Sequence, residues 1–174
     1  MPCWRARASV LRHAGRQSRN WKRDDTDAMA KRVAAVYIVV VLGLTLLPIF
    51  GVDPDDPIQV QLEPFQTIIA ALKAGLISRD FVLLAGNLVM LIPLGVLIPV
   101  LTGRRGWLRV FAGALALSGG IELAQLAISL LLGFGYRTAS VDDVITNVAG
   151  ALAGYALFLA YSSLSGRRST PADP

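Results

Sequence analysis

The stretch Val110–Leu132, VFAGALALSGGIELAQLAISLLL, decides the fold of this chain. A helix rises about 1.5 Å per residue, so roughly 20 apolar residues cross a hydrocarbon core of about 30 Å. Glu122 and Gln125 lie inside this stretch. A charged side chain at that depth costs about 2.5–3.5 kcal/mol on insertion scales, which predicts a polar partner and a specific role for the acid.

Three more apolar blocks of similar length flank this one, at Val33–Phe50, Phe81–Leu101 and Val144–Leu164. The whole chain of 174 residues is 54% hydrophobic and only 17% charged, with a mean hydropathy of +0.55. A soluble helical domain would keep too few residues for a polar exterior. Each block must be helical, because lipid offers no partner to free backbone groups. The sequence therefore predicts an all-α, integral membrane four-helix bundle.

The first block differs from a cleaved signal peptide. Its apolar run is longer than a signal-peptide core, and no small-residue cleavage site follows it. The chain continues instead through Pro48 into the acidic, proline-rich stretch 53–57. We expect a retained first helix.

The distribution of charge orients the bundle. Residues 1–32 hold nine Lys or Arg against three Asp, residues 102–109 hold three Arg and no acid, and residues 51–80 hold five acids against two bases. Positive segments stay cytoplasmic. We therefore expect a basic cytoplasmic arm (1–32), a transmembrane domain (33–164) and a cytoplasmic tail (165–174), with 51–80 and 133–140 outside.

The basic arm has more than one interpretation. With Trp4 and Trp21 it could bind nucleic acid, but a disordered segment near anionic lipid is preferred, so no specific nucleic-acid binding is expected. A further hypothesis is that translation starts at Met29, directly before the first helix. A peptide from residues 1–28 in the native protein would contradict it.

The chain lacks the residues that several kinds of chemistry need. Cys3 is the only cysteine and His13 the only histidine, and both lie in the arm. An intramolecular disulfide is excluded, as is most nucleophilic catalysis by Ser-His or Cys-His pairs, together with zinc sites made of His and Cys. Any chemistry must use carboxylates, amides, Arg or Ser. No phosphate-binding loop or dinucleotide motif is present.

The first outer loop contains an amphipathic pattern. Apolar residues recur at helical spacing after Pro64, at Phe65, Ile68, Ile69, Leu72 and Leu76. This pattern predicts a short helix that lies in the membrane interface. The alternative is that the same stripe packs on the mouth of the bundle.

The second block carries features of a bent helix. Asp80 is placed to cap its start. Pro93 removes one N–H and frees the carbonyl of Val89, and Gly95 removes a side chain, so we expect a kink. Asn87 is either a structural hydrogen-bonding group between helices or part of a site.

Polar residues on the third and fourth blocks repeat at helical spacing. Ser118, Glu122, Gln125 and Ser129 form one face, and Asp143, Asn147, Gly150 and Gly154 form another. We expect these faces to pack together near Asn87 and to bury a polar cavity in the outer half of the bundle. The ligand-binding candidates are Asn87, Glu122, Gln125, Arg137, Asp142, Asp143 and Asn147.

Alternatives exist for the acids. Ser140 followed by Asp142 and Asp143 also matches a helix N-terminus with acids in its first turn, which could be purely structural. That pattern does not account for Glu122. We further expect Arg137 to pair with Asp142 or Asp143, because an unpaired charge in a low dielectric is costly.

These residues carry a resemblance to the VanZ-like family of bacterial membrane proteins. Gly86–Gly95 resembles its N-x-x-x-F-x-P-x-G segment, with Leu91 in place of Phe. Ser118–Gln125 resembles its S-x-x-x-E-x-x-Q helix, and Arg137–Gly150 resembles its R-x-x-x-x-D-D-x-x-x-N-x-x-G signature. Leu62–Phe65 is similar to its N-P-F entry, with Glu63 in place of Asn. The resemblance covers residues 33 to 160 and implies a multi-pass protein of the bacterial cytoplasmic membrane. The family's namesake is associated with teicoplanin resistance.

Two classes of function follow. In the first, the protein is a non-enzymatic cell-envelope factor without a cofactor. It binds a membrane lipid or lipid-linked envelope molecule in the outer cavity and affects glycopeptide susceptibility. In the second, it is an intramembrane enzyme or transporter. Glu122, Asp142 and Asp143 would then hold a hard divalent cation or relay protons.

Overall fold

The computed structural model describes residues 26–47 and 53–167. Within these ranges four helices are long and apolar enough to cross a membrane: Thr26–Leu46, Arg79–Thr102, Trp107–Leu132 and Val141–Ser165. The prediction of an all-α membrane protein with four such helices is confirmed. The expected arm residues 1–25, the end of the first block at 48–50 and most of the tail lie outside the described residues.

The described residues divide into two compact units, with the boundary between Ile38 and Val39. The helix Thr26–Leu46 begins in the first unit and ends in the second. It starts earlier than the apolar run that predicted it. The second unit holds every other helix and all the contacts described below.

The second membrane-capable helix is interrupted at Leu91. It divides there into α3 (Arg79–Met90) and α4 (Ile92–Thr102). Pro93 occupies the first turn of α4, where its missing N–H is tolerated. The carbonyl of Val89, which Pro93 cannot bond, accepts a hydrogen bond from the N–H of Leu91. The expected kink is confirmed as a break between two shorter helices.

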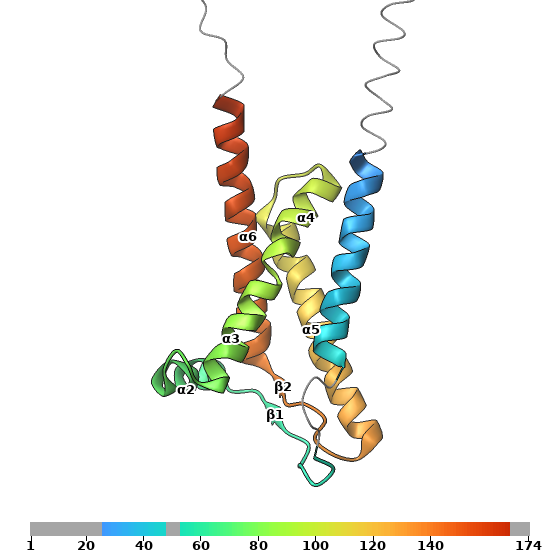
Figure 1. Ribbon diagram of the computed structural model, residues 1–174, viewed down its shortest axis with the longest axis vertical. Coiled ribbons are helices and arrows are strands. Elements are labelled where there is room, and N and C mark those ends of the chain that lie inside the picture. Colours follow the sequence, from blue (N-terminus) through green and yellow to red (C-terminus); the bar gives the residue numbers. More distant parts are fainter. Residues whose placement is uncertain (1–25, 48–52, 168–174) are drawn as a thin grey trace, which may run out of the picture. The chain divides into compact units, whose positions relative to one another are not determined.

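Helix α6 (Val141–Arg167) contacts α3, α4 and α5, the last spanning Trp107–Leu132 (Figure 1). Glycines allow the closest approach. A Cβ on Gly150 would lie 1.9 Å from the carbonyl oxygen of Leu88, and a Cβ on Gly154 would lie 1.9 Å from that of Ile92. The expected close backbone approach is confirmed. Its partner at Gly150 and Gly154 is the α3–α4 pair, whereas Asn147 on the same face of α6 reaches α5.

The loop after the first helix contains β1 (Val60–Gln61) and α2 (Gln66–Ala74). Strand β1 pairs in parallel with β2 (Ala139–Ser140), in the register Val60 to Ala139 (Figure 1). This pairing ties the first loop to the loop between α5 and α6. The predicted amphipathic helix exists, and its position in a membrane interface stays a prediction.

Side chains of α2 divide between two environments. Ala71 is buried, whereas Ile69, Leu72 and the following Leu76 are exposed. The helix packs on α3 and, to a lesser extent, on α6. Of the apolar stripe, Phe65 is also exposed and only Ile68 is half-buried, so most of the stripe faces away from the bundle.

The start of α3 corrects one expectation. Ser78 is its N-cap, and the Ser78 hydroxyl accepts from the N–H of Phe81 at 3.2 Å. Asp80 lies in the first turn instead of at the cap. There its negative charge still favours the positive end of the helix dipole.

Candidate functional site

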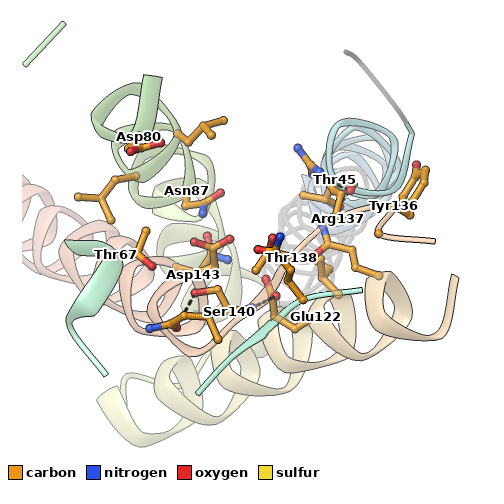
Figure 2. Close-up of a pocket in the computed structure, with 18 of the residues that line it drawn as sticks. Thr45, Thr67, Asp80, Asn87, Glu122, Tyr136, Arg137, Thr138, Ser140 and Asp143 are labelled. Atoms are coloured by element: carbon orange, nitrogen blue, oxygen red, sulfur yellow. Dashed lines mark hydrogen bonds between the residues drawn. The ribbon is translucent and has the colours of Figure 1, made fainter. Parts of the chain in front are cut away.

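A pocket of about 560 Å³ lies in the second unit, among the first helix, α3, α5, α6 and the β1–β2 loops. Six of the seven sequence-predicted candidates line it (Figure 2). They are Asn87, Glu122, Gln125, Arg137, Asp143 and Asn147. The polar cluster expected from helical spacing therefore surrounds one cavity, and Asp142 is the candidate that is not among its lining residues.

Glu122 approaches the pocket from α5. Its carboxylate Oε2 accepts a hydrogen bond from the backbone N–H of Ser140 at 2.7 Å (Figure 2). The Ser140 hydroxyl donates to the side-chain carbonyl of Gln61 at 3.1 Å and accepts from the N–H of Asp142 at 3.2 Å. The acid is thus tied to β2 where the chain enters α6, and Ser140 has the capping role that the sequence predicted.

Asp143 and Asn147 approach the pocket from successive turns of α6. The Asn87 side chain of α3 points toward the Asp143 carboxylate (Figure 2). Asn147 is only 2% exposed, and its Nδ2 donates to the hydroxyl of Ser118 at 2.8 Å. This hydrogen bond joins the polar face of α6 to that of α5, as expected.

The first helix ends against three of the site's side chains. The carbonyl of Thr45 accepts from Gln125 Nε2 at 2.9 Å and from Arg137 Nη1 at 2.8 Å. The Tyr136 hydroxyl donates to the carbonyl of Leu46. The last carbonyls of a helix lack intrahelical partners. Side chains from α5 and the following loop supply those partners here, and the Arg137 cation also suits the negative helix end.

The prediction that Arg137 forms an ion pair with Asp142 or Asp143 is wrong. Within the described residues, neither Asp142 nor Asp143 lies within 4.0 Å of the Arg137 guanidinium, which donates to the Thr45 carbonyl. Arg137 also has its backbone held by α5, since its N–H approaches the Ser129 hydroxyl at 3.5 Å. A helix end competes for the cation more effectively than acids only a few residues away in sequence.

Asp142 serves a different purpose. It is 0% exposed. Its Oδ1 accepts from the N–H of Phe65 at 2.5 Å, and its Oδ2 accepts from the N–H groups of Thr67 and Ile68 at 2.7 and 3.2 Å. These donors form the start of α2, where Phe65 has a left-handed backbone (φ 68°) and no cap of its own. Asp142 therefore caps a helix whose start lies 74 to 77 residues upstream, rather than facing the pocket.

Several lining residues were not predicted as site residues. They come from the first helix, the first loop, α3 and the loop before α6: Thr45, Asp56, Gln61, Thr67, Arg79, Asp80, Tyr136, Thr138 and Ser140. Most are polar residues in or beside loops, where polarity is ordinary and carries no signal. The β1–β2 pairing brings them to the pocket. Two-residue strands leave no periodicity that could have revealed it.

No three acids of the pocket come together in the described part of the chain. Among residues 26–47 and 53–167, no group of three or more His, Cys, Asp or Glu is arranged to hold a metal ion. Asp142, one of the three expected metal ligands, has both oxygens occupied by backbone N–H groups. The structure therefore offers no preformed cage for a hard divalent cation in the described part of the chain.

Comparison with known proteins identifies the family to which the chain is similar. The family model described as VanZ/LLP1 matches residues 34–162. This range includes every helix from the middle of the first to most of α6, together with all the lining residues of the pocket. No curated protein and no solved structure matched the chain.

Proposed function

Because the chain belongs to the VanZ/LLP1 family and holds this pocket within its matched region, we propose that it binds the head group of a membrane amphiphile there. The site would face the outer leaflet of the bacterial cytoplasmic membrane. By binding a lipid or lipid-linked envelope molecule, the protein would alter the susceptibility of the cell to glycopeptides or lipoglycopeptides. This is a binding role rather than a catalytic one.

The observation that carries the proposal is that the pocket is lined both by polar residues and by apolar residues on the exposed side of a membrane-capable helix. Most lining residues are polar or charged, but Leu83, Leu84 and Ile121 also contribute. Leu83 is 44% exposed on α3, so one wall of the pocket reaches the exposed surface of a membrane-capable helix. An amphiphile could place its head group among the polar residues while its chains stay in lipid.

Lipid retention tests this function directly. Protein purified in mild detergent should carry a defined lipid in native mass spectrometry, and a variant with a bulky side chain in the pocket, Thr138→Trp, should lose it. Thr138 is an exposed lining residue, so this change fills space without removing a buried contact. A wild-type protein that retains no lipid above the level of the blocked variant would contradict the proposal.

A second candidate function rests on the two acids that face the same cavity. Glu122 of α5 and Asp143 of α6 both line it (Figure 2). An intramembrane transporter or enzyme could use them to bind a cation or relay protons. Asp142 does not join them in this role, because it caps α2.

Glu122→Gln separates a functional acid from a structural one. Gln keeps the size and can still accept the Ser140 hydrogen bond, so the variant should fold with a melting temperature close to that of the wild type. We expect it nevertheless to lose activity, because an acid at this depth is costly unless its charge or proton is used. The measurement is glycopeptide susceptibility of cells that express each protein. Full activity of a folded variant would make the acid a mere hydrogen-bond acceptor.

A further inference from the structure

One buried atom at the pocket lacks a partner. Asn147 lines the pocket, and its Nδ2 is satisfied by Ser118, but its Oδ1 accepts no hydrogen bond within the described part of the chain. Buried side-chain oxygens are almost always paired, so an orphaned one calls for an explanation. The oxygen can only be satisfied by a donor.

The charged side chains that line the pocket are mostly hydrogen-bond acceptors. Four carboxylates line it, Asp56, Asp80, Glu122 and Asp143, against the two guanidinium groups of Arg79 and Arg137. Ionised carboxylates only accept hydrogen bonds. Acidic side chains therefore outnumber basic ones in a pocket whose orphaned oxygen needs a donor, and this favours a cationic ligand with N–H groups.

The arrangement suits an organic ammonium group better than a metal ion. Within the described residues the acids do not form a group of three that could ligate a metal. A primary ammonium carries three N–H donors, which can reach acceptors at separate points of a cavity. Quaternary ammonium groups have no such donors and are bound by cages of aromatic rings. Among the residues that the structure describes, Tyr136 is the one aromatic residue that lines this pocket.

The two guanidinium groups of the pocket suit the anionic half of a head group. Arg137 commits Nη1 to the Thr45 carbonyl, and a guanidinium has five N–H donors in all. Arg79 is exposed at the start of α3. Guanidinium groups bind phosphate well through paired N–H donors.

We infer that the pocket selects a zwitterionic phospholipid head group with a primary ammonium, of the phosphoethanolamine class. The ammonium donates to Asn147 Oδ1 and to the carboxylates of Glu122 and Asp143, and the phosphate lies toward Arg79 and Arg137. This inference rests on the proposed function and specifies its ligand.

A methylation series tests the inference. The protein is exposed to phosphatidylethanolamine, its N-monomethyl and N,N-dimethyl forms, phosphatidylcholine and phosphatidylglycerol with identical acyl chains, and bound lipid is quantified by native mass spectrometry. Retention should fall with each N–H replaced, and phosphatidylcholine should bind at least about tenfold more weakly than phosphatidylethanolamine. Equal retention of these two lipids would overturn the inference while lipid binding itself stands. Retention of none of the five would overturn the proposed function as well.

Asp143→Asn, which keeps the size of the side chain and removes its charge, tests the site. We expect it to lower the preference for phosphatidylethanolamine over phosphatidylcholine severalfold. The matched control is Glu63→Gln, an exposed acid of the first loop that does not line the pocket, which should leave the preference unchanged. Asn147→Ala should also lower the preference for phosphatidylethanolamine. If the Asn147→Ala protein does not fold, the result for Asp143→Asn decides. An unchanged preference in Asp143→Asn would overturn the assignment of the ammonium to this site.

Discussion

Each side chain of the polar face of α5, Ser118, Glu122, Gln125 and Ser129, joins a different segment of the second unit. Ser118 binds Asn147 of α6, Glu122 binds β2, and Gln125 binds the end of the first helix. Ser129 accepts from the N–H of Tyr136 and thereby shapes the loop that follows α5. In a bilayer, backbone groups without intrahelical partners need such side chains, since no water replaces them. The polar face is thus both the frame of the pocket and part of its lining.

Asp142→Asn should destabilise the protein more than Asp143→Asn. The Asp142 carboxylate holds three backbone N–H groups of α2 with two oxygens, and an amide offers only one acceptor and adds a donor that faces other donors. Hydrogen bonds to charged groups are worth about 1.5–3 kcal/mol, so we expect a loss of about 2 kcal/mol or more. Melting temperatures in detergent give the comparison. A smaller effect for Asp142 than for its neighbour would contradict its role as the cap of α2.

Arg137→Ala should likewise lower the melting temperature more than Arg104→Ala. Arg137 satisfies the Thr45 carbonyl at a helix end, whereas Arg104 is exposed in the loop between α4 and α5. The expected difference is up to about 1.5 kcal/mol, the usual contribution of one hydrogen bond. Gln125 also reaches the Thr45 carbonyl, which limits the loss. Two variants with the same melting temperature would mean that the guanidinium contributes nothing to this helix end.

At the scale of the element, three glycines set the distance between α6 and the α3–α4 pair. Gly95→Ala, Gly150→Ala and Gly154→Ala each place a Cβ 1.9 Å from a backbone carbonyl oxygen, which only a backbone shift can relieve. We expect each to cost about 1–3 kcal/mol or more. Gly119→Ala and Gly120→Ala on α5 are matched controls, because a Cβ at either meets nothing within 4 Å. They should be neutral or stabilising by up to about 1 kcal/mol through helix propensity. Similar melting temperatures across all five would remove the close approach as an explanation.

The sequence predicts helices and helix breaks well when they depend on neighbouring residues in the chain. Apolar length predicted the four membrane-capable helices, and Pro93 predicted the break at Leu91. Glycine spacing on α6 predicted close approach but not its partner, because a small-residue face fits any helix. Asp142 shows the limit most clearly. Its position beside Ser140 indicates a local capping role, yet its carboxylate caps a helix encoded far upstream.

At the scale of the whole molecule, the pocket depends on contacts that chain position alone does not reveal. Its candidates from α3, α5 and α6 were predictable, since helical spacing put them on shared faces. The contribution of the first loop was not, because it depends on the β1–β2 pairing and on Gly135, whose N–H donates to the Asp56 carbonyl at 2.7 Å. A Cβ at Gly135 would lie 2.3 Å from the carbonyl oxygen of Pro57, so this loop packing also requires glycine.

The orientation of the whole molecule follows from these loops together with the charge asymmetry. The β1–β2 pairing places the first and third loops at one end, as four crossings require, and the charge bias predicts that this end is outside. In a Cys3→Ser background, Asp55→Cys should react with a membrane-impermeant maleimide in intact cells, because Asp55 is an exposed residue of the first loop. Arg104→Cys, exposed in the arginine-rich loop between α4 and α5, should react only after the membrane is permeabilised. The reverse labelling pattern would mean that the protein has the opposite orientation in the membrane. The pocket would then face the cytoplasmic leaflet and its lipids.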